Sequence, residues 1–160
     1  MCRRLRIEAL DISPKALSRY AAAHEGSPVL MEGSILDIPA DDASYDGLFN
    51  LGVMEHFHLP DLARALGEFN RVLKPGARMV LFWPPAYGPS VLVLGFVHWI
   101  LNRVLGKNIR LHPAEHTHIR RRAETRAWLE AAGFTLRDFY FGPRDMFTHR
   151  IVVAEKVERS

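Results

Sequence analysis

Acidic, hydroxyl and imidazole side chains follow three short apolar runs of the sequence, at the points where those runs end. Asp11 closes the first run, Ser34 follows the run at 29–31, and His56 follows the run at 45–51. Open α/β sheets bind ligands beyond the carboxyl ends of their strands. A carboxylate there can accept hydrogen bonds from two neighbouring hydroxyl groups, and an imidazole can take a proton near neutral pH. We therefore expect a small-molecule site along one edge of a sheet.

A second group of chemically active side chains lies at 112–118. It consists of side-chain types that metal ions accept as ligands, namely His112, Glu115, His116 and His118. The spacing is not that of a zinc motif, and the single cysteine, Cys2, is far away in the sequence. We interpret the segment as a loop in which His118 contacts substrate, and we expect no metal site.

The elements that must position these groups alternate between apolar runs and helical patterns, which is typical of an α/β domain with a mainly parallel sheet. The predicted strands are 6–10, 29–31, 45–51, 79–83, and a closing pair at 134–141 and 149–156 that forms a hairpin. Three helices are predicted. The first starts at Ser13–Pro14, the second runs from about 62 until Pro75–Gly76 stops it, and the third spans 123–132 before Gly133. Because 79–83 is apolar throughout, we expect both faces of the sheet to be covered there.

The most apolar stretch of the chain is 91–105. It is interrupted by polar residues and is shorter than the ~20 residues that a bilayer span needs, so we expect no stable membrane insertion. Within a single domain spanning 1–160, we expect 86–118 to form a cap. Phe96 and Trp99 would line an apolar substrate pocket in it, although the same side chains could instead bury a sheet face.

Composition narrows the classes of function. Hydrophobic residues at 48% and charged residues at 24% are those of a globular domain. The formal net charge of +3 is concentrated near Arg3 and at 120–122 without interleaved aromatic residues, so we expect no nucleic-acid partner. A single cysteine and no recognisable signal peptide predict a cytoplasmic protein.

Five motifs resemble, in order and spacing, those of class I S-adenosylmethionine-dependent methyltransferases of the type 11 kind. They are LDISP at 10–14, GSILDIP at 33–39, the stretch from SYD to GVMEH at 44–56, RVLKPG at 71–76 and LEAAGF at 129–134. Each motif alone is weak, but the five in register cover nearly the whole chain. The resemblance implies a Rossmann-like, mostly parallel sheet with an antiparallel hairpin at its carboxyl end.

The resemblance also implies a site for S-adenosylmethionine. Its cofactor-binding residues would be Asp11, Ile12, Ser34, Ile35, Asn50 and Leu51. Asp11 would accept both ribose hydroxyls, Ile12 would lie on the adenine face, and the Ser34 hydroxyl and Ile35 amide would meet the adenine ring. Asn50 and Leu51 would border the amino acid and the sulfonium. Asp11 could instead be a solvent-facing acid at a helix start, and Ile12 plain core.

Methyl transfer is an in-line displacement, so positioning and water exclusion supply most of the catalysis. A hydroxyl acceptor also requires a base, and His56 is the candidate for it. Equally, His56 could be a structural residue that caps the next helix. The apolar stretch at 91–105 favours a small, hydrophobic acceptor.

The family's first strand and its G-x-G-x-G loop have no counterpart in this sequence. In the family's sheet that strand lies between the second and the fourth, so its absence predicts unpaired strand edges and an exposed apolar face. We expect that the recorded chain starts downstream of the true start; a second chain, such as a homodimer partner, or a different closure of the sheet are the alternatives. The same absence motivates a different function, that of a non-catalytic, degenerate domain acting as a binding or assembly module.

Overall fold

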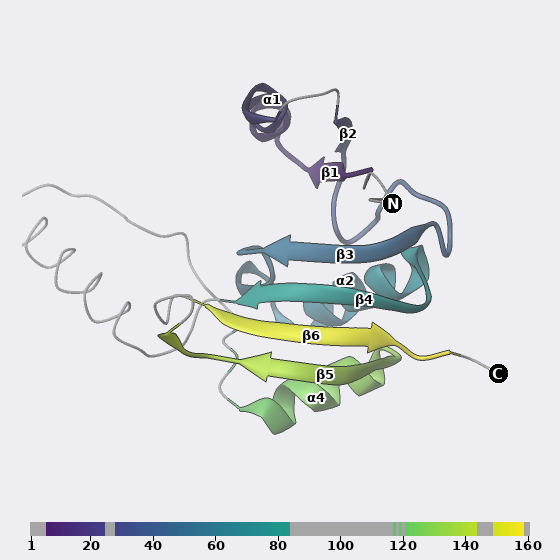
Figure 1. The fold of residues 1–160 in the computed structure, drawn as a ribbon, viewed down its shortest axis with the longest axis vertical. Helices are drawn as coiled ribbons and strands as arrows, with labels where there is room; N and C mark the ends of the chain where they lie inside the picture. The colour runs from purple at the N-terminus through teal and green to yellow at the C-terminus, as the bar shows by residue number, and fades with distance from the viewer. Residues whose placement is uncertain are drawn as a thin grey trace, which may run out of the picture.

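A computed structural model describes residues 6–24, 28–83, 117, 119, 121–143 and 149–158 of the chain. Strands and helices alternate along it, as a ribbon view shows (Figure 1). The strands are β1 (Glu8–Asp11), β2 (Val29–Glu32), β3 (Tyr45–Leu51), β4 (Leu73–Trp83), β5 (Phe134–Tyr140) and β6 (Arg150–Lys156). The helices are α1 (Pro14–Ala23), the 3₁₀ turn η1 (Met54–His56), α2 (Leu59–Val72) and α4 (Arg122–Ala131).

The strands form two separate sheets. β1 and β2 pair in parallel, with Glu8 opposite Val29 and Asp11 opposite Glu32. The second sheet has the order β3-β4-β6-β5, in which β3 and β4 are parallel and β6 is antiparallel to both of its neighbours. The predicted α/β fold with a closing antiparallel hairpin is thereby confirmed. Within the described part of the chain, no strand pairs with β1 and β3 to join the two sheets.

The carboxyl ends of β1, β3 and β4 lie on the same side of the molecule, because their arrows point the same way (Figure 1). A side-chain contact connects the two sheets at the opposite end of β3. The Tyr45 hydroxyl donates a hydrogen bond of 2.7 Å to Glu8 Oε2 and lies 3.7 Å from Met31 Sδ. The sheet edges that carry Asp11 and Leu51 are therefore held in a common orientation without being paired.

Helix α1 begins where the sequence predicts. Ser13 is its N-cap, and the Ser13 Oγ accepts a hydrogen bond of 3.3 Å from the Ala16 amide, with Pro14 in the first turn. Helix α2, by contrast, ends at Val72, before the predicted stop at Pro75–Gly76, which lies inside β4. The reason is local: Leu73 is already extended, with φ −78° and ψ 142°, and pairs with Tyr45 of β3.

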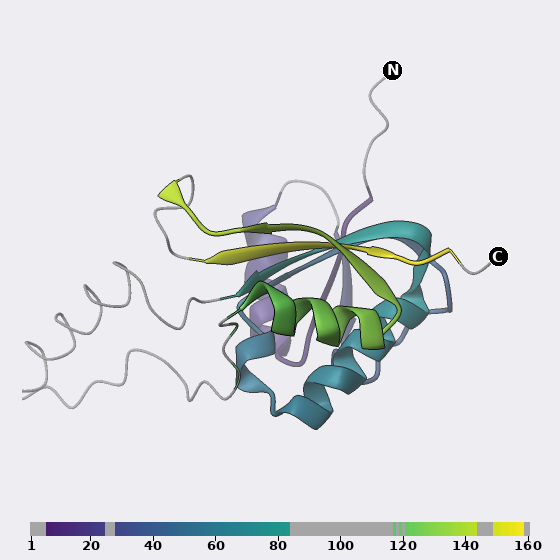
Figure 2. The same ribbon diagram turned by 90° about the horizontal axis from the view of Figure 1, so that it is seen from below.

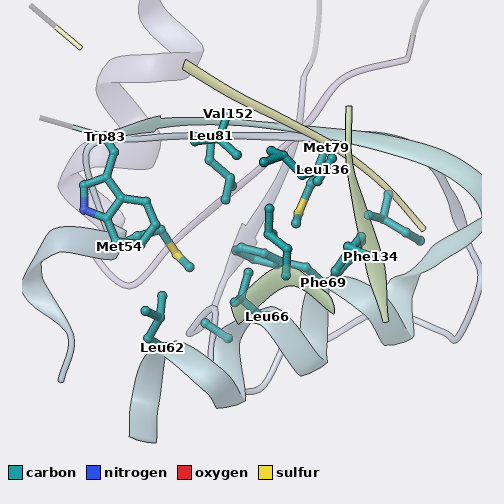
Figure 3. Packing of buried hydrophobic residues seen from close by; sticks show 14 of the residues in the cluster. Met54, Leu62, Leu66, Phe69, Met79, Leu81, Trp83, Phe134, Leu136 and Val152 are labelled. Atoms are coloured by element: carbon teal, nitrogen blue, oxygen red, sulfur yellow. The ribbon is translucent and has the colours of Figure 1, made fainter. Parts of the chain in front are cut away.

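The hydrophobic core lies between the four-stranded sheet and the helices α2 and α4, which cover the same face of it (Figure 2). Side chains from the sheet and from α2 point toward one another in this layer (Figure 3). The core members that are labelled there are Met54, Leu62, Leu66, Phe69, Met79, Leu81, Trp83, Phe134, Leu136 and Val152. Each large side chain buried in this way contributes about 1.5–3 kcal/mol.

The opposite face of the same sheet is apolar and open to solvent in the described part of the chain. Phe49 and Leu51 are 64% and 60% exposed, and beside them Val80 and Phe82 are only half-buried. These four residues are called the open face below. The expectation that both sheet faces are covered at 79–83 is therefore wrong for the described residues. Side chains alternate between faces along a strand, and the helices described on this sheet all lie on one of them.

None of the helices described here is long and apolar enough to cross a membrane.

Candidate functional site

Asp11 is fixed at the carboxyl end of β1 by the turn that starts α1. Its Oδ1 accepts a hydrogen bond of 2.8 Å from the Ser13 amide, and its backbone oxygen accepts one of 3.1 Å from the Gly33 amide. The residue is half-buried, and no hydrogen bond of Oδ2 occurs within the described residues. An ionised carboxylate has about four acceptor sites, so the Asp11 carboxylate retains capacity for ligand hydroxyls.

The loop at 33–42 begins beside Asp11 and folds into a tight turn. The Leu36 amide donates to Ser34 Oγ at 3.1 Å, and the Asp37 amide donates to the Ser34 carbonyl, also at 3.1 Å. Ile35 therefore sits at the tip of the turn, half-buried, and its amide makes no hydrogen bond among the described residues. The turn thus presents the two groups that the sequence assigns to adenine.

Gly33 lies where the two segments pack closely. A Cβ atom at this position would lie 3.1 Å from Pro39 Cδ and 3.2 Å from Leu10 Cδ1. The absence of a side chain therefore favours the close contact between the 33–42 loop and the end of β1.

Asn50, near the end of β3, has a buried and unsatisfied hydrogen-bond acceptor among the described residues. The residue is 8% exposed, and its Oδ1 has no hydrogen-bond partner among the residues that the structure describes. Such a buried acceptor costs about 1–3 kcal/mol unless a ligand or a water molecule satisfies it. The chain then turns at Gly52, whose φ of 67° favours glycine, and the neighbouring Leu51 is exposed. The end of β3 thus carries a polar side chain on the core face of the sheet and an apolar one on its open face.

His56 closes the 3₁₀ turn η1 directly after this strand exit. Its side chain is 35% exposed, and Nε2 lies 3.8 Å from Oε1 of the buried Glu55. The N-cap residue of α2 is His58, two positions after His56. An imidazole beside a buried carboxylate and partly open to solvent is suited to exchanging a proton.

Thr117 fastens η1 to the sheet. The Thr117 amide donates to the Glu55 carbonyl at 3.0 Å, and Trp83 Nε1 donates to the Thr117 carbonyl at 3.0 Å. The Thr117 hydroxyl also donates to the Phe57 carbonyl. These bonds hold the backbone around His56 against the carboxyl end of β4.

Among the described residues, the predicted site residues fall into two groups in space. Asp11, Ser34 and Ile35 come together through the contact between β1 and the 33–42 loop. Asn50, Leu51 and His56 lie at the exit of β3, in the other sheet. Ile12 is 74% exposed, which does not agree with the core alternative. Phe96, Trp99 and His118, with almost all of the 86–118 cap, lie outside the described residues.

Two charged residues of the site are missing from the sequence prediction. Glu68 and Arg71, on α2, bind the backbone of the 33–42 loop. Their partners lie about 30 positions away in the sequence, so helical spacing gives no sign of the contact. Of these two residues, only Arg71 lies in a motif of the sequence analysis, RVLKPG at 71–76. Among the described residues, no group of three or more His, Cys, Asp or Glu side chains could hold a metal ion.

Comparison with known proteins gives a consistent result. A family model described as a methyltransferase domain matches residues 1–81. An uncharacterised methyltransferase of Mycobacterium bovis is 38% identical over 81 residues, which are 51% of this chain and 32% of that protein. A probable S-adenosylmethionine-dependent methyltransferase of Mycolicibacterium smegmatis is 29% identical over 136 residues, covering 83% of this chain and 45% of that protein. The chain therefore spans less than half the length of these two relatives.

Solved structures share the fold. The 1,6-didemethyltoxoflavin-N1-methyltransferase of Burkholderia thailandensis, with bound 1,6-didemethyltoxoflavin and S-adenosylhomocysteine, superposes with a TM-score of 0.64. The match covers 96% of this chain and 62% of that protein at 20% identity. A likeness at this level of identity supports the Rossmann-like architecture of the two sheets taken together.

Proposed function

Because the chain belongs to the methyltransferase domain family, we propose that it carries the adenosine-binding half of an S-adenosylmethionine site and transfers the methyl group to a small, hydrophobic acceptor. The observation that carries this proposal is the contact between the end of β1 and the 33–42 loop. The Gly33 amide donates to the Asp11 carbonyl at 3.1 Å, which holds the turn that carries the Ser34 hydroxyl and the Ile35 amide against the end of β1. The Asp11 carboxylate, the hydroxyl and the amide are the groups that a ribose diol and an adenine ring require.

The residues present fit the adenosine portion of the cofactor. Asp11 retains acceptor capacity for the ribose hydroxyls, because only Oδ1 is engaged among the described residues. The exposed Ile12 offers an apolar surface to one face of the adenine ring. The Ile35 amide and the Ser34 hydroxyl are available to the ring's polar edge, with Ser34 Oγ already accepting from Leu36.

The residues at the exit of β3 fit the reacting end of the cofactor, which carries the sulfonium and the amino acid. When bound, the cofactor supplies an electrophilic methyl group on a sulfonium. The buried and unsatisfied Asn50 Oδ1 supports the presence of a polar ligand group here, and the exposed Leu51 would help to exclude water from the reacting atoms.

His56 is the proposed base for a hydroxyl acceptor. Its ring would hold the acceptor's proton, and the Glu55 carboxylate 3.8 Å from Nε2 lies within ion-pair distance of the charged ring. Removal of such a base costs about 10²- to 10⁴-fold in rate. The apolar character of 91–105 supports a hydrophobic acceptor, and the Burkholderia thailandensis protein of the same fold is named for a small-molecule acceptor.

The site is completed, in this proposal, by a further parallel strand between β1 and β3. Three observations support it: the two sheets do not pair, their carboxyl ends face the same side, and the open face next to β3 is apolar. Unpaired backbone groups and exposed apolar area both favour an added strand with a covering helix. An in-frame strand and glycine-rich loop in the coding DNA ahead of Met1 would identify its source. A stop codon directly ahead of Met1 would point to a second chain instead.

Methyl transfer tests the function directly. The complete protein would be incubated with methyl-labelled S-adenosylmethionine and a panel of apolar phenols, amines and carboxylates, beside the His56→Gln variant. We expect label in one acceptor class, with a loss of about 10²-fold or more in His56→Gln if that class is phenolic. Tight cofactor binding without transfer to any acceptor would contradict the enzymatic proposal.

The second candidate function is that of a non-catalytic binding or assembly module. The observation that favours it is the open face, where Phe49 and Leu51 are more than half exposed. Exposed apolar patches of this kind commonly mark interaction sites. Sedimentation over a range of concentrations tests it, and a protein that remains monomeric and gains no partner would count against it.

A further inference from the structure

The guanidinium of Arg71, in the last turn of α2, binds the backbone of the 33–42 loop. Its Nη1 donates to the Ala40 carbonyl at 2.7 Å, and its Nη2 donates to the Ile38 carbonyl at 2.8 Å. A third bond, from Nη1 to Asp42 Oδ1 at 2.9 Å, joins the same segment but lies at the surface. One side chain of the helix thus binds two backbone carbonyls and one carboxylate of the loop.

Glu68 orients the Arg71 side chain and binds the loop itself. Arg71 Nε and Nη2 donate to the two Glu68 carboxylate oxygens at 2.9 and 2.8 Å, in a bidentate pair. Glu68 Oε2 also accepts a hydrogen bond of 2.8 Å from the Ile38 amide. Both backbone polar groups of the buried Ile38 are therefore bound by the same ion pair.

The charge state of this pair is secure at neutral pH. The hydrogen bonds from Arg71 lower the pKa of Glu68, and the Ile38 amide lowers it further. The hydrogen bonds from Glu68 and Asp42 raise the pKa of Arg71. The carboxylate and the guanidinium are both charged wherever the protein would work, so the bonds to the loop persist.

The Ser34 turn at the start of the loop is closed by its own short-range bonds, from Leu36 and Asp37. Those bonds shape the turn but do not fix its place relative to the sheet. Its upstream side is set by the Gly33–Asp11 contact, and its downstream side by Arg71 and Glu68 at Ile38. Displacement of Ile38 would therefore move the Ile35 amide and the Ser34 hydroxyl away from the Asp11 carboxylate.

We propose that Arg71, together with Glu68, is a positioning residue for cofactor binding. It acts by holding the Ser34–Ile35 turn in the place where the adenine ring would bind. This inference rests on the proposed function. A lysine cannot replace Arg71, because it lacks the planar fork that serves Glu68 and two carbonyls at once. The rival explanation is that Arg71 only stabilises the fold, and the test must separate the two.

Lys156, the last residue of β6, provides a matched control that binds the end of the same helix. Its Nζ donates to the Asn70 carbonyl at 2.6 Å and to the Leu73 carbonyl at 2.7 Å, where α2 passes into β4. It therefore stabilises the end of α2 through charged hydrogen bonds, as Arg71 does, but it has no bond to the 33–42 loop. Lys156→Met should destabilise the protein without moving the turn.

The experiment compares Arg71→Lys and Lys156→Met in the complete protein by titration with S-adenosylhomocysteine and by amide hydrogen exchange. In Arg71→Lys we expect affinity to fall about tenfold or more, the loss that one or two charged hydrogen bonds represent. The loss should be the same for 5′-methylthioadenosine, which lacks the amino acid. The amides of Leu36, Asp37 and Ile38 should exchange faster, while those of Met79 and Leu81 should not.

Lys156→Met is expected to lower the melting temperature while leaving affinity and loop exchange unchanged. Equal losses of affinity in the two variants, or full affinity in Arg71→Lys, would overturn the positioning role and leave the proposed function intact. A wild-type protein that binds neither ligand would overturn the proposed function, and the positioning role with it. Faster exchange at Leu36–Ile38 would then show only that the ion pair holds the loop.

Discussion

The Tyr45 hydroxyl donates a hydrogen bond of 2.7 Å to Glu8 Oε2, and this contact joins β3 to β1 although the two strands do not pair. Burial of the phenol, followed by the hydrogen bond to Glu8, raises the pKa of Tyr45 to about 12. The neutral phenol is therefore the form that the folded protein prefers. This bond is one of the contacts that connect the two sheets, and with them the strands that carry Asp11 and Asn50.

Tyr45→Phe should lower the free energy of unfolding by about 1 kcal/mol at pH 8, which is the usual net contribution of one hydrogen bond. The contribution has a defined pH window. An unfolded tyrosine ionises near pH ~10, whereas Tyr45 keeps its proton to about pH 12, so the stabilisation is complete below pH 10 and is lost as pH rises toward 12. Urea midpoints at pH 8 and 11 measure it, with Tyr20→Phe as the control. If the urea midpoints of wild type and Tyr45→Phe fell equally between these pH values, the Tyr45–Glu8 hydrogen bond would not be the source of the pH dependence.

Asp11→Asn should weaken S-adenosylhomocysteine binding by the complete protein about ten- to a hundredfold, since charged hydrogen bonds to the ribose would be lost. Asparagine keeps an oxygen that can accept from the Ser13 amide, so the start of α1 should survive the change. Glu32→Gln, at the exposed end of the neighbouring strand, is the control for charge. Calorimetric titration decides the matter, and unchanged affinity in Asp11→Asn would refute the ribose assignment.

Gly133→Ala and Gly67→Ala should have opposite effects on stability. Gly133 has a φ of 81°, and a Cβ atom there would lie 3.0 Å from Asn70 Nδ2. We expect Gly133→Ala to cost about 1–2 kcal/mol, from left-handed backbone strain. Gly67 lies inside α2 with nothing within 4 Å of a new Cβ, so Gly67→Ala should gain about 0.5–1 kcal/mol. Thermal unfolding measures both, and a stabilising Gly133→Ala would mean that the α4–β5 turn is built differently.

Glu68→Gln should make the free energy of unfolding less dependent on pH in the acid range. The lowered pKa of Glu68 means that its contribution is present above pH ~4.3 and is lost as pH falls through the folded value. Wild type should therefore lose stability faster than Glu68→Gln between about pH 5 and pH 3, as followed by urea unfolding at several pH values. Glu130→Gln on α4 controls for the removal of a carboxylate. Parallel curves for wild type and Glu68→Gln would show that the Arg71 pair contributes nothing that depends on pH.

Local signals in the sequence predicted most of the elements. Ser13–Pro14 before a helix and Gly133 after one act through their own backbone preferences, and both stand where expected. The end of α2 was predicted too late, because Leu73 is drawn into β4 by its pairing with Tyr45, a residue 28 positions away. Coverage of the sheet by the described residues was overestimated, because an apolar strand shows what could be buried and not which elements lie over it.

Only part of the candidate site could be predicted from the sequence. Motif order predicted a site at Asp11, the 33–42 loop and the exit of β3, and the structure has each of these at or directly after the end of a strand. The bonds from Arg71 and Glu68 to Ile38, and from Tyr45 to Glu8, connect residues about 30 or more positions apart. No periodicity or spacing rule encodes such contacts, which exist only once the helix and the sheets have packed.

Calorimetric titration with S-adenosylhomocysteine tests the central claim most directly, using this 160-residue chain beside a version extended by the residues encoded upstream of Met1. We predict tight binding by the extended protein and binding at least about tenfold weaker by the shorter chain, because the strand between β1 and β3 would complete the site. Equal binding by both would place the completing strand elsewhere. Absence of binding by both would contradict the cofactor site at Asp11 and the 33–42 loop.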